Sequence, residues 1–280
     1  MIELLPSAPW VRQRLLSPSV YLDHWALRRF STNAAEGTRF TEALKRKAGT
    51  LVLSWANMAE FLAMDANTTA AADAERFIDA NWPRLYFIRS EPFEVARRED
   101  MRARGELNET PEGDDQLASI SGLNTTRGGL HLPSVSGLLT TVMSAKDQLE
   151  AGAKSLKVSV RDAAMLRFEK AKADPAEQAK IDKAPTAPGR ARATLSAAEL
   201  LLRGIFCKGS RAMEENDTFD LLHAAVPLAY CDYVLLDGKW RDLADTAIRE
   251  MRVAGVTAAL AAVYSGKKGQ VEQFLAAQET

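Results

Sequence analysis

Five short runs of β-branched, aromatic and leucine residues, separated by helical segments, constrain the fold of this chain more than any other feature. They read SVYLD (19–23), LVLSW (51–55), LYFIRS (85–90), DYVLLD (232–237) and LAAVYS (260–265). The segments between the runs have helical patterns of about ten residues or more, which is typical of parallel strands joined by crossover helices. The sequence therefore predicts an α/β fold, with a parallel sheet of about four to five strands flanked by helices.

Residues 106–193 differ in composition from the rest of the chain. All five tryptophans and all five tyrosines lie outside this stretch, and Phe168 is its one aromatic residue. It begins with a polar loop and a Gly/Ser/Thr-rich piece, 121–137, and continues with a long helical pattern. The apolar positions that recur every seven residues in this pattern are Val142, Leu149, Leu156 and Ala163.

The segment 172–193 is rich in alanine, proline and charge, which is typical of a flexible linker. We therefore expect residues 1–105 and 194–280 to form one domain, interrupted by a mainly helical insertion, 106–193, that ends in this linker. Four roles for the insertion stay open: an inert decoration, a lid or substrate clamp, a dimer contact, and a surface for a partner protein.

Charge and cysteine content exclude several classes of protein. The net charge is −1, from 36 basic and 37 acidic residues, whereas proteins that coat nucleic acid non-specifically are usually far more basic. Cys207 and Cys231 are too few for a disulfide framework or a zinc cluster. No run approaches the ~20 apolar residues of a membrane span, and the start of the chain lacks the features of a signal peptide. We expect a cytoplasmic protein without membrane contact.

Acidic residues occur where the expected strands end. Asp23 closes the first run and Asp237 closes the fourth, while Glu60 lies about two turns into the helix after the second run. Asp220 lies in the first turn of a helix over 216–231. A helix rises ~1.5 Å per residue and a strand ~3.3 Å, so this helix and the strand that follows return to the same edge of the sheet. Parallel α/β sheets place reactive groups at that edge.

A cluster of this kind needs a counter-charge. Asp217 precedes Asp220 by three residues and shares its helix face, so four or five carboxylates are expected at one edge. Like charges raise each other's pKa, and hard divalent cations such as Mg²⁺ or Mn²⁺ resolve the repulsion. Two such ions about 4 Å apart can activate water and stabilise the leaving oxygen in phosphoryl transfer. The N-terminus of the helix that carries Asp217 and Asp220 also favours bound anions.

Three segments resemble the acidic motifs of the PIN-domain family. They read YLDHWALRRF, LVLSWANMAEF and NDTFDLLHAAVPLAYCDYVLLDGKW, and the resemblance covers roughly 1–105 and 194–280. Members carry an Asp after the first strand, a Glu in the helix after the second, an Asp opening a late helix and an Asp after the next strand. The residues that match these places, in order, are Asp23, Glu60, Asp220 and Asp237.

The resemblance implies a metal-dependent nuclease that acts mostly on RNA, commonly as the toxin of a toxin–antitoxin pair or in RNA processing; some members cut structured DNA. This chain departs from the family in two ways. The insertion makes it longer than compact toxin-type members, and its last motif, LLDGKW, lacks the Thr or Ser that many members carry shortly before the final acid.

On this basis we expect an Mg²⁺- or Mn²⁺-dependent endoribonuclease that cleaves RNA phosphodiester bonds with metal-activated water. Two alternatives stay open: a non-catalytic PIN-like interaction module with vestigial acids, and a structure-specific DNA nuclease. The expected partners are RNA, with DNA, a protein inhibitor and a second copy of the chain left open. The four motif acids are the expected catalytic residues, and together with Asp217 they are the expected metal ligands. The candidates for substrate binding are Arg28, Arg29, Ser54 and Lys239.

Five further residues near the acids are expected to have structural roles. A metal-bound hydroxide needs no histidine base, so we expect His24 and His223 to be packed or solvated. Trp25 and Trp240 follow two of the acids and are expected in the core. Asp232 begins the strand that Asp237 ends, so it lies at the opposite edge of the sheet.

Overall fold

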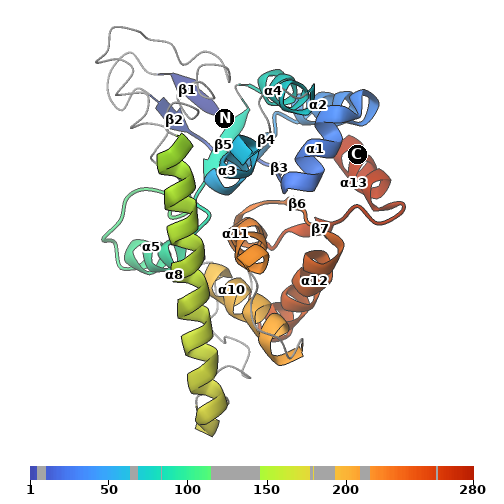
Figure 1. The fold of residues 1–280 in the computed structure, drawn as a ribbon. Helices are drawn as coiled ribbons and strands as arrows, with labels where there is room; N and C mark the ends of the chain where they lie inside the picture. The colour runs from blue at the N-terminus through green and yellow to red at the C-terminus, as the bar shows by residue number, and fades with distance from the viewer. Residues whose placement is uncertain are drawn as a thin grey trace, which may run out of the picture.

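The computed structural model describes residues 1–4, 11–63, 69–82, 84–114, 146–176, 179, 193–208, 215–256 and 258–280. At its centre lies a five-stranded parallel sheet with the order β5-β4-β3-β6-β7 (Figure 1). The strands are β3 (Ser19–Leu22), β4 (Thr50–Ser54), β5 (Leu85–Ile88), β6 (Tyr233–Leu235) and β7 (Ala262–Tyr264). The predicted fold class is confirmed.

The central strand β3 shows why the strands read as continuous apolar runs. All four of its residues are buried. Tyr21 belongs to the core on one face of the sheet and Val20 and Leu22 to the core on the other face. Side chains alternate between the faces of a strand, and a parallel sheet is covered on both faces. Both sets of positions must therefore be apolar.

One face of the sheet is covered by four helices that share an aromatic core. The helices are α1 (His24–Thr32), α2 (Ala34–Arg46), α4 (Thr69–Ala80) and α13 (Gln270–Glu279). Phe40 lies at the centre of this core, with its ring centroid 5.3 Å from that of Phe30 and 6.0 Å from that of Phe274. Stacked rings of this kind add to the stability that burial supplies.

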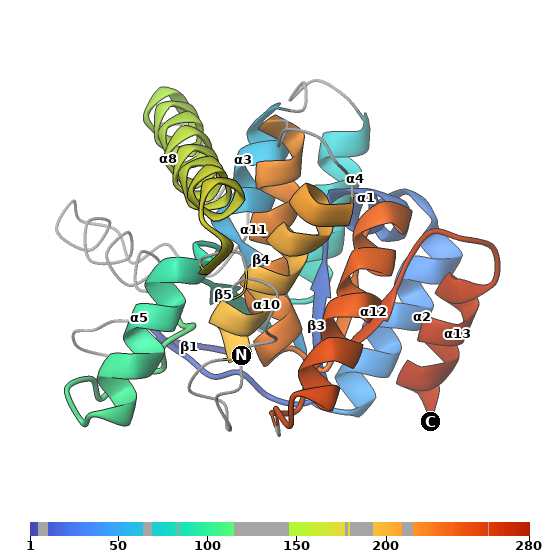
Figure 2. The same cartoon turned by 90° about the horizontal axis from the view of Figure 1, so that it is seen from below.

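The other face is covered by a second set of helices. They are α5 (Pro92–Ala103), α8 (Lys146–Ala173), α10 (Ala193–Arg203), α11 (Glu215–Tyr230) and α12 (Gly238–Val253). A π-helical segment, Gly204–Lys208, follows α10, and α3 (Trp55–Ala63) follows β4 directly. Figure 2 shows α2 and α13 at one side of the molecule and α8 at the other. β1 (Ile2–Leu4) and β2 (Val11–Gln13) form a separate antiparallel pair.

The first part of the expected insertion packs against the sheet. The Arg89 backbone N donates to the Glu112 carbonyl oxygen at 2.8 Å, and the Asp114 N donates to the Phe87 carbonyl oxygen at 3.1 Å. Residues 112–114 therefore run along the outer side of β5. The Gly/Ser/Thr-rich piece lies outside the described residues, as does most of the expected linker.

Helix α8 belongs to the same core as the sheet. Val160, Ala164 and Phe168 are buried along one side of it, and the Phe168 ring stacks on that of Phe206 with centroids 4.2 Å apart. The buried positions repeat every four residues. The expected seven-residue repeat is wrong at Ala163, which is exposed; Val142 and the side chains of Leu149 and Leu156 lie outside what the structure describes.

Phe168→Ala is expected to lower the free energy of unfolding by about 3 kcal/mol, because it removes a buried, stacked ring and leaves a cavity. Leu166→Ala is the matched control: Leu166 lies on the same helix and is 56% exposed, so its loss should cost less than about 0.5 kcal/mol. Urea denaturation measures both. Equal midpoints for the two variants would show that α8 does not contribute to the cooperative core.

Asp232 joins the starts of β3 and β6. Its Oδ2 accepts hydrogen bonds from the Ser19 backbone N at 2.7 Å and from the Ser19 hydroxyl at 2.9 Å. Its own backbone N donates to the Ser19 carbonyl oxygen at 3.0 Å. Asp232 thus has the structural role expected of it. Within the described ranges, no helix is both long enough and apolar enough to span a membrane.

Candidate active site

Two of the predicted acids follow neighbouring strands at the same edge of the sheet. Leu22 of β3 lies opposite Leu235 of β6 in the parallel register. Asp23 follows β3 directly, and its backbone N donates to the Leu235 carbonyl oxygen at 3.2 Å. Asp237 lies two residues beyond β6. The topology therefore brings together two acids that are separated by more than two hundred positions in the chain.

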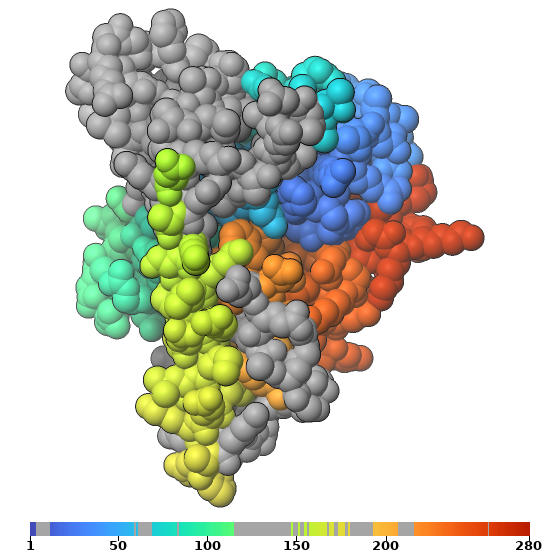
Figure 3. All heavy atoms as spheres, viewed as in Figure 1, coloured from blue at the N-terminus to red at the C-terminus, as the bar shows by residue number. Residues whose placement is uncertain are grey.

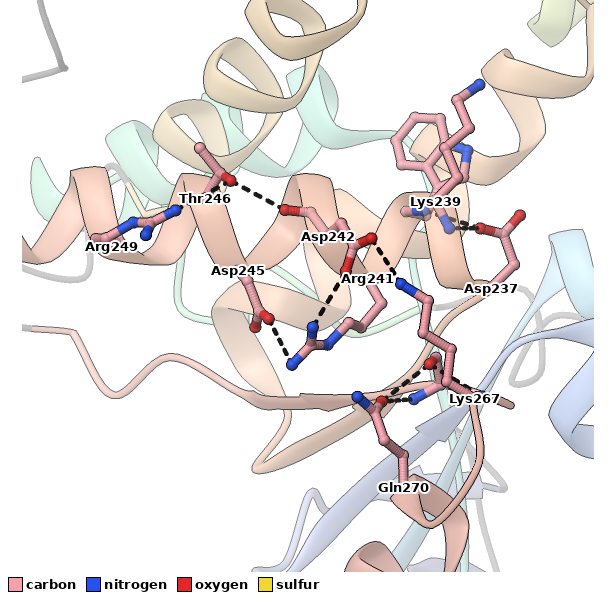
Figure 4. A network of polar contacts seen from close by, with 11 residues as sticks. Asp237, Lys239, Arg241, Asp242, Asp245, Thr246, Arg249, Lys267 and Gln270 are labelled. Atoms are coloured by element: carbon pink, nitrogen blue, oxygen red, sulfur yellow. Dashed lines mark hydrogen bonds and ion pairs between the residues drawn. The ribbon is translucent and has the colours of Figure 1, made fainter.

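Both of these carboxylates also cap helices. Asp23 precedes α1, and its Oδ1 accepts from the Ala26 backbone N at 3.2 Å. Asp237 precedes α12, and its Oδ1 accepts from the backbone N of Lys239 at 2.9 Å and of Trp240 at 2.8 Å (Figure 4). A helix N-terminus stabilises negative charge, so each carboxylate is oriented by the helix it begins.

Glu60 of α3 meets a buried histidine from α11. His223 is 3% exposed, and its Nε2 lies 2.9 Å from Oε2 of Glu60. On the other side of the ring, Nδ1 lies 2.5 Å from the Tyr21 hydroxyl, which is 3.0 Å from the Ser54 hydroxyl. His24 lies farther from the glutamate, with Nδ1 at 3.8 Å from the same Oε2. A polar chain therefore runs from Glu60 into the core.

The contact between Glu60 and His223 favours the charged form of each group. Burial acts to lower the pKa of His223, but Glu60 and the charges of Asp23 and Asp220 outweigh it and raise that pKa. Burial acts to raise the pKa of Glu60, but His223, with His24 and Lys157 as smaller contributors, lowers it. The geometry therefore supports an anionic glutamate beside a cationic histidine.

Two other acids in the site, Asp23 and Asp220, resist ionisation. Burial raises the pKa of Asp23 to about 8, and Glu60 and Asp237 add to the shift while His223 and the Ala26 N–H oppose it. Burial raises the pKa of Asp220 to about 6, and Asp237 and Glu60 add to that shift. We call Asp23, Glu60, Asp220 and Asp237 the acid cluster. Its members act on one another electrostatically, so full ionisation requires added positive charge.

Three of the remaining predicted site residues form ion pairs. Asp217 is buried, and its Oδ1 lies 2.6 Å from Nζ of Lys239, so one candidate metal ligand is paired with one candidate substrate-binding residue. Arg29 forms two hydrogen bonds of 2.6 Å with Glu36.

Ser54 is buried, and its hydroxyl donates to Oδ1 of Asn57 at 3.1 Å. Arg28, on α1, is exposed. Of the four substrate-binding candidates, Arg28 is thus exposed, while Arg29 and Lys239 are paired with acids and Ser54 is held in the core.

Carboxylate oxygens are suitable ligands for a hard cation, but the side chains are not arranged as a complete set of metal ligands. Within the described part of the chain, no group of three Asp, Glu, His or Cys side chains is placed to hold a metal ion. Asp23 and Asp237 each accept hydrogen bonds from a helix N-terminus, and Glu60 contacts His223.

The sequence did not predict that His223 contacts Glu60 and Tyr21. The signal was present, since His223 follows Asp220 by three residues and therefore shares its helix face, but its partners come from two distant segments. The expectations for the tryptophans are confirmed: Trp240 is 1% exposed in the core, and Trp25 packs against the other core and against Gly266. Cys231 is buried and is not in a disulfide.

The loop after β7 is tied to the helix that begins at Asp237. Nζ of Lys267 lies 2.7 Å from Oδ2 of Asp242 on α12 (Figure 4). Gln270, at the start of α13, accepts from the Ser265 backbone N at 2.9 Å. These contacts fix the loop that borders the edge of the sheet where Asp237 lies.

Comparison with family models, with curated proteins and with solved structures gives no match for this chain.

Proposed function

We propose that this chain is an Mg²⁺- or Mn²⁺-dependent endoribonuclease of the PIN type. The observation that supports the proposal is the acid cluster. Asp23 and Asp237 follow neighbouring strands at the carboxyl edge of the sheet, and the charges of Glu60 and Asp237 act on both Asp23 and Asp220. Burial raises the pKa of Asp23 and of Asp220. Helix capping accounts for Asp23 and Asp237 singly, but not for the mutual repulsion of the acids in the cluster. A nuclease needs acids near one another, because carboxylates are the groups that bind divalent cations.

When bound, such an ion supplies a Lewis acid for the phosphate and lowers the pKa of the attacking water. The chain's own residues provide the setting. Asp23, Asp220 and Asp237 supply negative charge at the edge of the sheet. His223 contacts the Tyr21 hydroxyl through Nδ1 and Glu60 through Nε2, and thereby fixes the position of Glu60. In the net reaction a water oxygen bonds to phosphorus and the bond from phosphorus to the leaving ribose oxygen breaks.

The proposal is tested with purified protein and a short, labelled single-stranded RNA. We expect cleavage with Mn²⁺ or Mg²⁺, none after excess EDTA, and recovery when Mn²⁺ is restored. Isothermal titration calorimetry should detect Mn²⁺ binding to the same protein. If Mn²⁺ binds but only hairpin or flap DNA is cut, the DNA nuclease reading replaces this one. If Mn²⁺ does not bind and no substrate is cut, the chain is a non-catalytic module.

A further inference from the structure

Helix α8 brings a cation to the acid cluster. Nζ of Lys157 lies 3.8 Å from the centroid of the Phe219 ring. Phe219 belongs to α11 and immediately precedes Asp220 in the chain. The positive charge of Lys157 also acts on Glu60, where it opposes the effect of burial alongside the two histidines. The ring contact therefore places this lysine against α11, and its charge reaches Glu60 of the cluster.

The position of Lys157 is set by the packing of its helix. α8 contacts both α3 and α11, the helices that carry Glu60 and Asp220. Figures 1 and 3 show α8 crossing the front of the molecule beside α11. Three residues beyond Lys157, the buried Val160 begins the apolar side that anchors α8 in the core. The lysine is therefore presented by a fixed element.

The ammonium group of Lys157 keeps donors available for a ligand. Within the described part of the chain it forms no ion pair, and its recorded partner is the face of an aromatic ring. A ring face attracts a cation but accepts no conventional hydrogen bond, whereas an ammonium group has three N–H donors. Lys239 differs, because Asp217 already accepts from it at 2.6 Å.

We propose that Lys157 is a substrate-positioning residue that binds a backbone phosphate of the RNA next to the acid cluster. The proposal rests on the proposed nuclease function and assigns α8, within the expected insertion, a part in substrate binding. An anionic backbone entering an acidic site meets repulsion, and a fixed ammonium group at the border of that site offsets it. The Phe219 ring holds the ammonium group in place before the substrate arrives.

The test compares Lys157→Met with Lys154→Met, an exposed lysine one turn earlier on the same helix. Both changes are made in the Asp23→Asn background, so that a short fluorescein-labelled single-stranded RNA stays intact, and thermal melting verifies folding. We expect Lys157→Met to weaken RNA binding about threefold to tenfold and to reduce the salt dependence of log Kd by about 0.7, the value for one phosphate contact on a single strand. Lys154→Met should leave both values unchanged.

A second measurement separates phosphate binding from a merely structural role. Loss of a nearby positive charge should tighten Mn²⁺ binding to the otherwise unaltered protein, by about twofold to fivefold, whereas disruption of the site would weaken the binding of Mn²⁺ and RNA together. Equal RNA affinity and salt dependence in the two lysine variants would overturn the role of Lys157 and leave the nuclease function intact. If the parent protein neither binds nor cuts RNA, the proposed function fails and this inference with it.

Discussion

Asp220→Asn is expected to reduce Mn²⁺-dependent RNA cleavage by about 100-fold or more. Asparagine has nearly the same shape but lacks the negative charge, so the variant loses part of the attraction for a divalent cation, an interaction worth several kcal/mol to the transition state. Asp220 is the sharpest choice because it lies within α11 and no helix cap depends on it: the caps of α1 and α12 are formed by Asp23 and Asp237.

The control is Asp79→Asn. Asp79 is exposed near the end of α4 that leads into β5, hence at the opposite edge of the sheet. Its replacement should leave cleavage unchanged. Initial rates are measured at saturating Mn²⁺ with equal protein concentrations, after circular dichroism has verified that both variants fold. Cleavage by Asp220→Asn at the parent rate would remove Asp220 from the proposed site.

Asp23→Asn is expected to stabilise the metal-free protein, increasingly so as the pH rises from about 4 to about 8. The pKa of Asp23 is raised by burial from 3.8 to about 8 in the folded protein. Below about pH 4 both states are protonated and the group has no effect. Above it, the unfolded chain ionises first, so stability is lost progressively until the folded pKa is reached. At ~1.36 kcal/mol per pKa unit, the difference by pH 8 is on the order of 5 kcal/mol.

Asparagine removes this loss without removing the cap, because its side-chain oxygen serves an N-cap as well as that of aspartate. Urea denaturation in EDTA at about pH 5 and about pH 8 measures the effect. The stability gain of the variant over the parent should be larger at the higher pH. A gain that is the same at both values would contradict the raised pKa. Added Mn²⁺ should stabilise the parent protein more than the variant.

The strands were predictable because the burial of a parallel strand is visible in its own residues. A parallel strand is buried on both faces, so a strand such as β4 contains consecutive apolar residues, 51–53, and is recognised without knowing its neighbours. Asp23 and Asp237 were predictable for the same reason, since each follows a run of this kind. Asp232 was correctly read as structural, because a residue at the start of a strand lies at the opposite edge from one at its end.

The ion-pair and hydrogen-bond partners of the site residues were not predictable, because they come from segments far apart in the chain. The sequence favoured Asp217 as a metal ligand and Lys239 as a substrate contact, and nothing local indicated that the two form an ion pair with each other. His223 was expected to be packed or solvated; it is packed, but between Tyr21 and Glu60. The helical repeat through Ala163 failed because α8 packs on the core through positions four residues apart.

By itself, the sequence determined the parallel α/β architecture and the positions of Asp23 and Asp237 after neighbouring strands at one edge of the sheet, since strand burial and chain reach leave few other arrangements. Only the tertiary structure decided how the acids of the cluster are charged and what surrounds them. Burial raises the pKa of Asp23 and Asp220, His223 neutralises Glu60, and α8 places Lys157 beside Phe219. Desolvation and charge pairing depend on distances that exist only after the separate segments have packed together.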